Sequence, residues 1–373
     1  MVLKRLLVFV LLTALLLSFC PTYAYSAKAL VVYEPQNGCF LEALRGDEKL
    51  PMASTTKIMT ALLVLENADL SRELKIPSVA VGVEGSSMYL AKDESLTVKE
   101  LLYGLMLTSG NDAATALAYH VGGGDISRFV DMMNAKSKSL GLVSTHFTNP
   151  SGLPDDDHYT TAKELAKLTS FALENPVFAE ICSAKTVKIR KNGIPNGRTL
   201  SNHNKFLSMY DGAIGVKTGF TKKAGRCLVS AAIRDGVTLI CVTLCAPDDW
   251  NDHKTALDNA FERTELYRLA KKGEISVSLP TPDGKTVTAK NADEITCVVI
   301  DGKLPRKTTL ADNFVYAPSS AGDIVGEVVF DTEYGTVANA YLYLTDRVEA
   351  PLKKELFLSG IIRFIRNIFK WKN

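Results

Sequence analysis

Residues 51–66 read PMASTTKIMTALLVLE, and this stretch bears on both the fold and the chemistry. From Lys57 to Glu66 it is apolar on nearly all sides, which predicts a buried helix. Ser54 and Lys57 are spaced by about one helical turn, so their side chains share a face. A serine hydroxyl needs a base, and Lys57 can be that base if burial, a second cation and the helix N-terminus lower its pKa. Chance alone gives about one Ser-x-x-Lys in a chain this long, so a plain helix cap with a solvated lysine is the better explanation of this pair by itself.

Two further short motifs lie downstream. Ser109-Gly110-Asn111 separates two helical patterns, over Val98–Leu107 and Asp112–Val121, and simple helix capping explains it. Lys217-Thr218-Gly219 falls late in a strand expected over Ala213–Phe220, where a glycine permits a ligand to approach the backbone closely. A strand that merely ends in a turn gives the same pattern. Each motif is weak alone.

Together, in this order, the three motifs match the signature of penicillin-binding proteins and class A β-lactamases. More narrowly, the chain resembles the D-alanyl-D-alanine carboxypeptidases among the low-molecular-mass penicillin-binding proteins, the S11 serine peptidase family. The resemblance covers about residues 28–271. It rests on five stretches: Met52–Thr60, Ser109–Ala114, Asn149–Leu153, Asn202–Leu207, and Lys217–Thr221 with Ala224-Gly225.

The resemblance implies an acyl transfer in which Ser54 attacks the carbonyl between the two D-alanines of a peptidoglycan stem peptide. The last D-alanine leaves, and water hydrolyses the acyl-enzyme. Lys57 would serve as general base toward Ser54. Ser109 would relay a proton to the leaving amine, and Asn111 would orient Lys57 and the substrate amide. β-Lactams such as penicillin imitate the D-Ala-D-Ala terminus, so they are expected to acylate the same serine.

The resemblance also implies a substrate-binding strand. Lys217 would keep the field positive, which lowers the pKa of Lys57 and attracts the terminal carboxylate. Thr218 would hydrogen-bond that carboxylate, and the backbone N–H groups of Ser54 and Phe220 would form the oxyanion hole. The substrate-binding set is therefore Lys217, Thr218, Gly219, Phe220 and Thr221. This chemistry needs no metal, nucleotide or flavin, and we expect no cofactor.

One segment departs from the family pattern. Many relatives carry an arginine after the strand that follows the Lys-Thr-Gly hairpin, and it helps to hold the substrate carboxylate. Here residues 248–253 read DDWNDH, without an arginine. Carboxylate binding must then rest on Lys217 and Thr218, with Thr221 as a further candidate. The preference among stem peptides stays open.

Two alternatives share part of this evidence. A secreted serine β-lactamase carries the same three motifs but needs an extra deacylating glutamate before the Lys-Thr-Gly strand. The corresponding residues 149–161 contain Asp155, Asp156 and Asp157 but no glutamate. A non-catalytic wall-binding protein would not require Ser54, Lys57 and the other motif residues together. A serine carboxypeptidase is the favoured interpretation.

The pattern of elements predicts an α+β fold, an antiparallel sheet covered by helices with a helical insertion, similar to β-lactamases and transpeptidases. The expected strands are Ala29–Tyr33, Cys39–Arg45, Ala213–Phe220, Cys227–Ile233 and Thr238–Leu244. The expected helices are Lys57–Glu66, Val98–Leu107, Asp112–Val121, Ile126–Ser139, Thr161–Glu174 and Thr255–Lys271. Residues 25–272 would form the peptidase domain, and residues 273–346 a small all-β domain. Its expected strands are Ile275–Leu279, Thr286–Ala289, Ile295–Val299, Ile324–Phe330 and Val337–Leu344.

Both ends of the chain carry patterns typical of targeting segments. Lys4 and Arg5, the apolar residues 6–19 and a small-residue site at Ala24 predict a signal peptide over residues 1–24, and a retained anchor is the alternative. Residues 347–373 form a linker and a helical pattern over Leu352–Trp371, apolar on one face and basic on the other. This pattern is typical of a helix in a membrane interface, and packing on the protein itself is the alternative. We therefore expect export and residence at the outer face of the cytoplasmic membrane or in the cell wall.

The composition is that of an ordinary globular protein. The chain is 46% hydrophobic and 23% charged, which argues against long disorder. Its net charge of +2 argues against nucleic acid as a partner. The cysteines beyond the signal peptide are dispersed, and we expect them to be small buried hydrophobes. They are Cys39, Cys182, Cys227, Cys241, Cys245 and Cys297.

Overall fold

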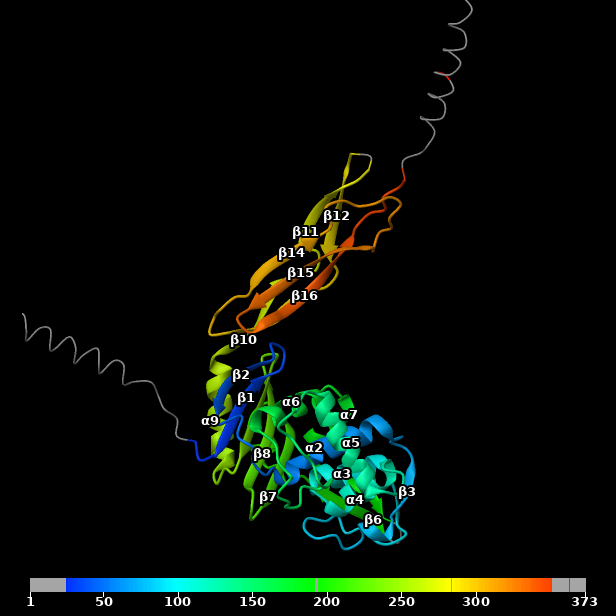
Figure 1. The fold of residues 1–373 in the computed structure, drawn as a ribbon, viewed down its shortest axis with the longest axis vertical. Helices are drawn as coiled ribbons and strands as arrows, with labels where there is room; N and C mark the ends of the chain where they lie inside the picture. Colours follow the sequence, from blue (N-terminus) through cyan, green and yellow to red (C-terminus); the bar gives the residue numbers. More distant parts are fainter. Residues whose placement is uncertain (1–24, 192–193, 283, 351–361, 363–373) are drawn as a thin grey trace, which may run out of the picture. The chain divides into compact units, whose positions relative to one another are not determined.

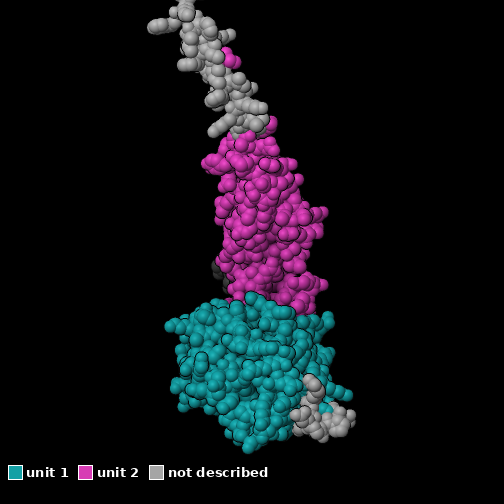
Figure 2. All heavy atoms as spheres, turned by 90° about the vertical axis from the view of Figure 1, so that its right-hand side faces the viewer, with its two compact units in different colours: residues 1–32, 42–230, 241–256 teal, residues 33–41, 231–240, 257–373 magenta. Residues whose placement is uncertain are grey.

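The computed structural model describes residues 25–191, 194–282, 284–350 and 362 (Figure 1). Its contacts divide the chain into two compact units (Figure 2). Unit 1 comprises residues 1–32, 42–230 and 241–256, and unit 2 comprises residues 33–41, 231–240 and 257–373. The expected domain limits stay predictions. The expected signal peptide and, apart from Ile362, the expected amphipathic helix lie outside the described residues.

A five-stranded sheet in the order β2-β1-β9-β8-β7 forms the centre of the fold. Short turns join β1 to β2, β7 to β8 and β8 to β9, so these neighbours run antiparallel. The turn between β8 and β9 has positive φ angles of 48° at Asp235 and 81° at Gly236, as a tight hairpin requires. The strands are β1 Ala29–Glu34, β2 Cys39–Leu44, β7 Ala213–Thr221, β8 Gly225–Arg234 and β9 Val237–Leu244. All five were expected.

Helices from the middle of the chain cover this sheet, and Figure 1 shows α2 to α7 gathered beside β7 and β8. Every residue of α2 from Lys57 to Val64 is buried, which confirms the expected buried helix. Thr97 and Glu100 form a capping box that starts α3. The helices are η1 Ala53–Thr56, α2 Lys57–Asn67, η2 Ser78–Ala80, α3 Val98–Leu107, α4 Asn111–Val121, α5 Ile126–Ser139, α6 Ala162–Leu173, α7 Pro176–Ser183, α8 Phe206–Met209 and α9 Asp249–Glu262. The expected α+β class is confirmed.

Two small hairpins interrupt the helical region, and the sequence patterns did not predict them. β3 Glu73–Lys75 pairs with β4 Ser95–Thr97, and β5 Thr186–Lys191 pairs with β6 Ile194–Ser201. The loop between β3 and β4 and the segment after β6 both reach the site described below.

The expected helix Thr255–Lys271 is wrong beyond Glu262. There the chain forms β10, Thr264–Ala270, which pairs antiparallel with β13 from Thr264↔Ile300 to Arg268↔Thr296. Its sequence is rich in residues that favour helices, but the backbone pairing with β13 overrides that local preference.

Unit 2 contains a second five-stranded sheet in the order β11-β12-β16-β15-β14. Its strands and β13 are β11 Ser276–Pro280, β12 Thr286–Asn291, β13 Ile295–Ile300, β14 Arg306–Ala311, β15 Ile324–Thr332 and β16 Gly335–Leu344. The expected all-β region is confirmed, although β14 was not predicted. No described helix is long and apolar enough to cross a bilayer. All six described cysteines are free and, except for half-buried Cys245, buried, as expected.

Candidate active site

Ser54 lies in the short helix η1, and Lys57 is the first residue of α2. The Nζ atom of Lys57 lies 2.9 Å from Ser54 Oγ, 2.7 Å from Asn111 Oδ1 and 2.6 Å from the Ser151 carbonyl oxygen. The amide and carbonyl oxygens can only accept hydrogen bonds. A neutral Lys57 amine therefore gives its two N–H groups to them, and its lone pair is left facing the Ser54 hydroxyl. This is the arrangement of a base beside its nucleophile.

Electrostatics favour that neutral amine. Burial is the main cause that lowers the pKa of Lys57 well below its usual value, and the positive charge of Lys217 acts in the same direction. The carboxylate of Asp112 opposes them. The expected effect of Lys217 is confirmed, but burial is the larger cause.

Ser109 lines the pocket, and Asn111 contacts Lys57 from the start of α4. Ser109 has a positive φ of 58°, and its buried hydroxyl has no hydrogen-bond partner among the described residues. Asn111 opens α4, where its side-chain amide donates to the Glu84 carbonyl at 2.6 Å and its backbone N–H donates to the Ser86 carbonyl at 2.7 Å. Asn111 thus connects Lys57 to the loop that follows η2.

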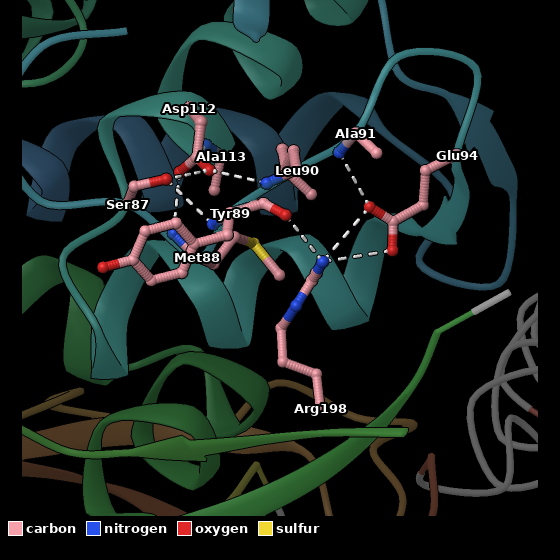
Figure 3. A network of polar contacts seen from close by, with 9 residues as sticks. All are labelled: Ser87, Met88, Tyr89, Leu90, Ala91, Glu94, Asp112, Ala113 and Arg198. Atoms are coloured by element: carbon pink, nitrogen blue, oxygen red, sulfur yellow. Dashed lines mark hydrogen bonds and ion pairs between the residues drawn. The ribbon is translucent and has the colours of Figure 1, made fainter. Parts of the chain in front are cut away.

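Asp112 and Glu94 fix that loop, as Figure 3 shows. The Asp112 carboxylate accepts from the Ser87 hydroxyl at 2.6 Å, from the Met88 N–H at 3.1 Å and from the Leu90 N–H at 3.0 Å. A loop held from the helix that carries Asn111 keeps its place against the site.

Arg198 of β6 secures the far end of the same loop (Figure 3). Its Nη2 atom donates to the Tyr89 carbonyl at 2.9 Å and to the Glu94 carboxylate at 3.2 Å. Glu94 in turn accepts from the Ala91 N–H at 3.0 Å. The loop residues between η2 and β4 are therefore tied to two separate elements.

The strand β7 passes directly beside the nucleophile. A Cβ atom on Gly219 would lie 3.0 Å from the Ser54 backbone nitrogen and 3.2 Å from the Met52 carbonyl oxygen, so only glycine fits without displacing the neighbouring backbone. Lys217 is buried, donates to the Thr218 carbonyl at 2.9 Å and has its pKa lowered by burial to about 7. Thr221 ends the strand, where its hydroxyl accepts from the Ala224 N–H at 3.0 Å.

A pocket of about 340 Å³ opens at this place. The expected site residues that line it are Ser54, Ser109, Thr218, Gly219 and Phe220. Lys57, Asn111 and Lys217 lie buried and are not among its lining residues, and neither is Thr221. The lining residues to which sequence reasoning gave no role are Ser86, His203, Lys205, Arg226, Asp249 and Trp250. Among the residues that the structure describes, no group of three or more His, Cys, Asp or Glu could hold a metal ion.

The geometry of the site suits the expected acyl transfer, and a comparison with known families identifies the class of enzyme. Residues 19–248 match the model of the D-alanyl-D-alanine carboxypeptidase family of S11 peptidases. The chain belongs to this family. DacF, a D-alanyl-D-alanine carboxypeptidase of Bacillus subtilis, is 30% identical, and the alignment covers 97% of both chains. The D-alanyl-D-alanine carboxypeptidase of Streptomyces sp. strain K15 is 38% identical over 56% of this chain and 77% of its own length.

Solved structures agree with that assignment. Penicillin binding protein 5 from Haemophilus influenzae superposes with a TM-score of 0.70 at 27% identity, over 88% of this chain and 99% of that one. The chain is thus a serine-type D-Ala-D-Ala carboxypeptidase. Nothing in these comparisons favours the β-lactamase or the non-catalytic alternative.

Two structural contacts of this carboxypeptidase escaped the sequence analysis. The Asn149–Leu153 stretch was part of the resemblance but received no role. Asn149 Oδ1 accepts from the N–H groups of Gly152 at 2.8 Å and Leu153 at 3.1 Å, and this turn presents the Ser151 carbonyl to Lys57. No periodic pattern reveals a backbone carbonyl as a partner of a catalytic base.

His158 is the second such contact. Its Nδ1 atom accepts from the Thr148 N–H at 3.0 Å, so Nε2 carries the proton and donates to Thr56 Oγ1 at 2.7 Å. Thr56 Oγ1 donates onward to the Ala53 carbonyl at 2.7 Å. Burial is the main cause that lowers the pKa of His158 to about 4, which keeps the ring neutral. The neutral ring thus stabilises the turn that carries Ser54.

Proposed function

We propose that this carboxypeptidase removes the terminal D-alanine of peptidoglycan stem peptides through an acyl-enzyme on Ser54. The observation that carries the proposal is the set of contacts made by the Lys57 amine. Two of its partners, Asn111 Oδ1 and the Ser151 carbonyl oxygen, can only accept hydrogen bonds, and the third is the Ser54 hydroxyl at 2.9 Å. Burial and Lys217 lower the pKa of Lys57, so the amine is suited to act as base.

The reaction begins when Lys57 takes the hydroxyl proton and Ser54 Oγ bonds to the carbonyl carbon between the two D-alanines. The carbonyl electrons move to the oxygen, which accepts hydrogen bonds from the N–H groups of Ser54 and Phe220. The C–N bond then breaks, and the proton passes through Ser109 to the leaving amine of D-alanine. Water attacks the ester in the second half, with the same base, and frees Ser54.

The pocket supplies the charge for binding the peptide terminus. Lys217 is buried in β7, and its neighbour Thr218 in the same strand lines the pocket. A cation attracts the terminal carboxylate, and a hydroxyl donates a hydrogen bond to it. These two groups favour substrates that end in a free carboxylate, as stem peptides do.

Penicillin is the second ligand that we propose for this site. A β-lactam carries an amide and a carboxylate in the same relation as D-Ala-D-Ala, so Ser54 opens its ring and keeps the acyl group. Residues 149–161 contain no glutamate to activate a deacylating water, which supports slow release.

One experiment tests the chemistry. The purified protein is incubated with diacetyl-Lys-D-Ala-D-Ala and assayed for free D-alanine, and separately with penicillin followed by peptide mass spectrometry. We expect D-alanine release, an adduct on Ser54, and loss of both in Ser54→Ala. Ser139→Ala is the matched control, because Ser139 is exposed and lies outside the pocket. An adduct on another residue would contradict the assignment of Ser54.

We propose further that residues 1–24 are a signal peptide and that Leu352–Trp371 binds the outer face of the cytoplasmic membrane. The support is the sequence: one face of the pattern carries large apolar residues, each worth about 1.5 to 3 kcal/mol when removed from water. The other face is basic, and each Lys or Arg adds about 1 kcal/mol near an anionic surface. The sum of the two contributions suits stable attachment.

Truncation before Leu352 tests this anchor. The full-length and truncated proteins are sedimented with anionic vesicles and assayed on the model tripeptide, with neutral vesicles as a control for charge. We expect only the full-length protein to sediment, less so with neutral lipid, and both to hydrolyse the tripeptide equally. Equal sedimentation would refute the anchor. Loss of hydrolysis on truncation would mean that the segment packs on the enzyme instead.

A further inference from the structure

The pocket beside Ser54 contains an arginine that the sequence comparison did not point to. Arg226 is the second residue of β8, the strand next to β7, and it lines the same pocket as Ser54 and Thr218. The segment 248–253, where many relatives carry a carboxylate-binding arginine, has none. The guanidinium therefore enters the pocket from a different strand.

The side chain of Arg226 is held in place from two directions. Its Nε and Nη2 atoms donate to Asp249 Oδ1 at 3.0 and 2.6 Å. Its guanidinium carbon lies 5.6 Å from the centre of the Trp250 ring, within range of a cation–π contact. Trp250 in turn stacks on the buried Phe206, with ring centres 6.3 Å apart and planes 14° apart. The Ala246 N–H donates to the Arg226 carbonyl at 2.9 Å, which fastens this segment to β8.

This support leaves part of the guanidinium available. Asp249 occupies one edge, through Nε and Nη2, and the Nη1 atom has no hydrogen-bond partner among the described residues. The side chain of Arg226 is 41% exposed, whereas that of Asp249 is 3% exposed. The buried carboxylate thus holds the arginine while the free N–H groups remain accessible to a ligand.

The charges around the pocket favour an anion there. Its lining includes two basic side chains, Arg226 and Lys205, and one acidic side chain, Asp249. Asp249 is engaged with Arg226, so the accessible charge is positive. A planar guanidinium can bind a carboxylate through two parallel hydrogen bonds, which an ammonium cannot do.

We propose that Arg226 binds the terminal carboxylate of the substrate and thereby selects peptides with a free C-terminal D-alanine. Asp249 and Trp250 act as positioning residues that hold the guanidinium toward the pocket. The inference rests on the proposed function, since it concerns the leaving residue of the same reaction. It assigns to β8 the role that many relatives give to the segment after β9.

Two substrates separate this role from a merely structural one. The full-length protein is assayed on diacetyl-Lys-D-Ala-D-Ala and on the same peptide with a C-terminal carboxamide. Loss of a charge-assisted hydrogen bond in Arg226→Gln should lower kcat/KM on the acid about 10- to 100-fold. The amide should be cleaved at nearly the wild-type rate, so the preference for the acid should shrink by the same factor. Arg226→Lys should keep part of that preference because it keeps the charge.

Arg234→Gln is the matched control. Arg234 lies on the same strand, pairs with Asp258 at 2.9 Å and does not line this pocket. Its loss should leave the acid-to-amide ratio unchanged. Equal losses on both substrates in Arg226→Gln and Arg226→Lys, or no loss on the acid, would overturn the proposal.

A second measurement keeps the test independent of the peptidase reaction. Penicillin carries a carboxylate, and a penicillin methyl ester does not. The acylation rate of Arg226→Gln should fall with penicillin and stay unchanged with the ester. If the ratio of the penicillin rate to the ester rate is the same in wild type and variant, Arg226 does not have this role. If the wild type cleaves neither peptide, the proposed function fails, and the acylation ratio still decides the arginine.

Discussion

The close approach of β7 to the nucleophile makes Gly219→Ala a sharp test of the site geometry. The added Cβ would lie 3.0 Å from the Ser54 nitrogen, 3.2 Å from Ala53 Cβ and 3.2 Å from the Met52 carbonyl oxygen, where ordinary contacts begin at 3.4 Å. The strand and the turn must therefore separate by a few tenths of an ångström. Two of the three contacts are backbone atoms, so a side-chain rotation cannot relieve them.

That separation acts on the oxyanion hole rather than on the base. In the proposed mechanism the N–H groups of Ser54 and Phe220 form this hole, and Phe220 directly follows Gly219 in β7. The contact of Lys57 with Ser54 lies within η1 and α2. Losing one oxyanion donor costs about 10²- to 10³-fold in rate, and a partial displacement should cost about 10- to 100-fold. We expect this loss both in acylation by penicillin and in tripeptide hydrolysis.

The assay compares acylation rates of the wild type, Gly219→Ala and Gly141→Ala. Gly141 has a φ of 71° with no atom near its Cβ position, so alanine there strains the backbone outside the pocket. The control should lose stability but keep its acylation rate. Wild-type acylation in a folded Gly219→Ala protein would refute the assignment of the oxyanion hole.

Four further outcomes follow from the same geometry. Lys57→Arg should lose at least about 100-fold in acylation, because arginine stays protonated and cannot act as base; retention of most activity would mean that another group takes the proton. Penicillin should give a burst equal to the enzyme concentration followed by slow release, and rapid steady turnover would favour a β-lactamase. Lys217 is charged below its pKa of about 7 and neutral above it, so kcat/KM for the acid substrate should fall as pH rises through about 7. The value of kcat/KM for the amide substrate should not fall in this way. An acid-to-amide ratio of kcat/KM that stays constant from pH 6 to 9 argues against this role. His158 has a pKa of about 4 in the folded protein and about 6.5 in the unfolded one, so its contribution to the free energy of unfolding is complete above pH 6.5 and is lost toward pH 4 at about 1.4 kcal/mol per pH unit. Urea unfolding should therefore show a smaller difference in stability between wild type and His158→Gln at pH 5 than at pH 7.5. A stability difference that stays the same at both pH values contradicts this.

Periodicity predicted the elements whose local preference and burial agree. α2 is apolar all round and buried, and the β8–β9 hairpin carries the Asp235-Gly236 pair that its turn requires. β10 failed because its residues favour a helix locally, and only its partner β13, far along the chain, makes it a strand. β14 is an edge strand with mostly exposed side chains, so it has no apolar alternation to find.

The candidate site divides in the same way. Ser54, Lys57, Ser109, Asn111 and Lys217 belong to short motifs, and the structure brings them together. Arg226 belongs to no motif, because its role depends on which strand lies beside β7 and on the segment that holds its side chain. A backbone carbonyl such as that of Ser151 carries no sequence signal at all.

The site contains two buried lysines, Lys57 and Lys217, whose burial costs free energy. Lys57 is completely buried and Lys217 is 1% exposed, and a buried ammonium is expensive unless it is neutralised or well hydrogen-bonded. Here burial lowers the pKa of both amines, and the charge of Lys217 lowers that of Lys57 further. The charge of Lys217 therefore makes Lys57 easier to deprotonate. A neutral Lys57 still donates its two N–H groups to Asn111 and Ser151. Deprotonation therefore changes only its contact with Ser54, in which the serine hydroxyl becomes the donor. The same burial that destabilises the charged lysine thus favours the neutral amine that acts as base.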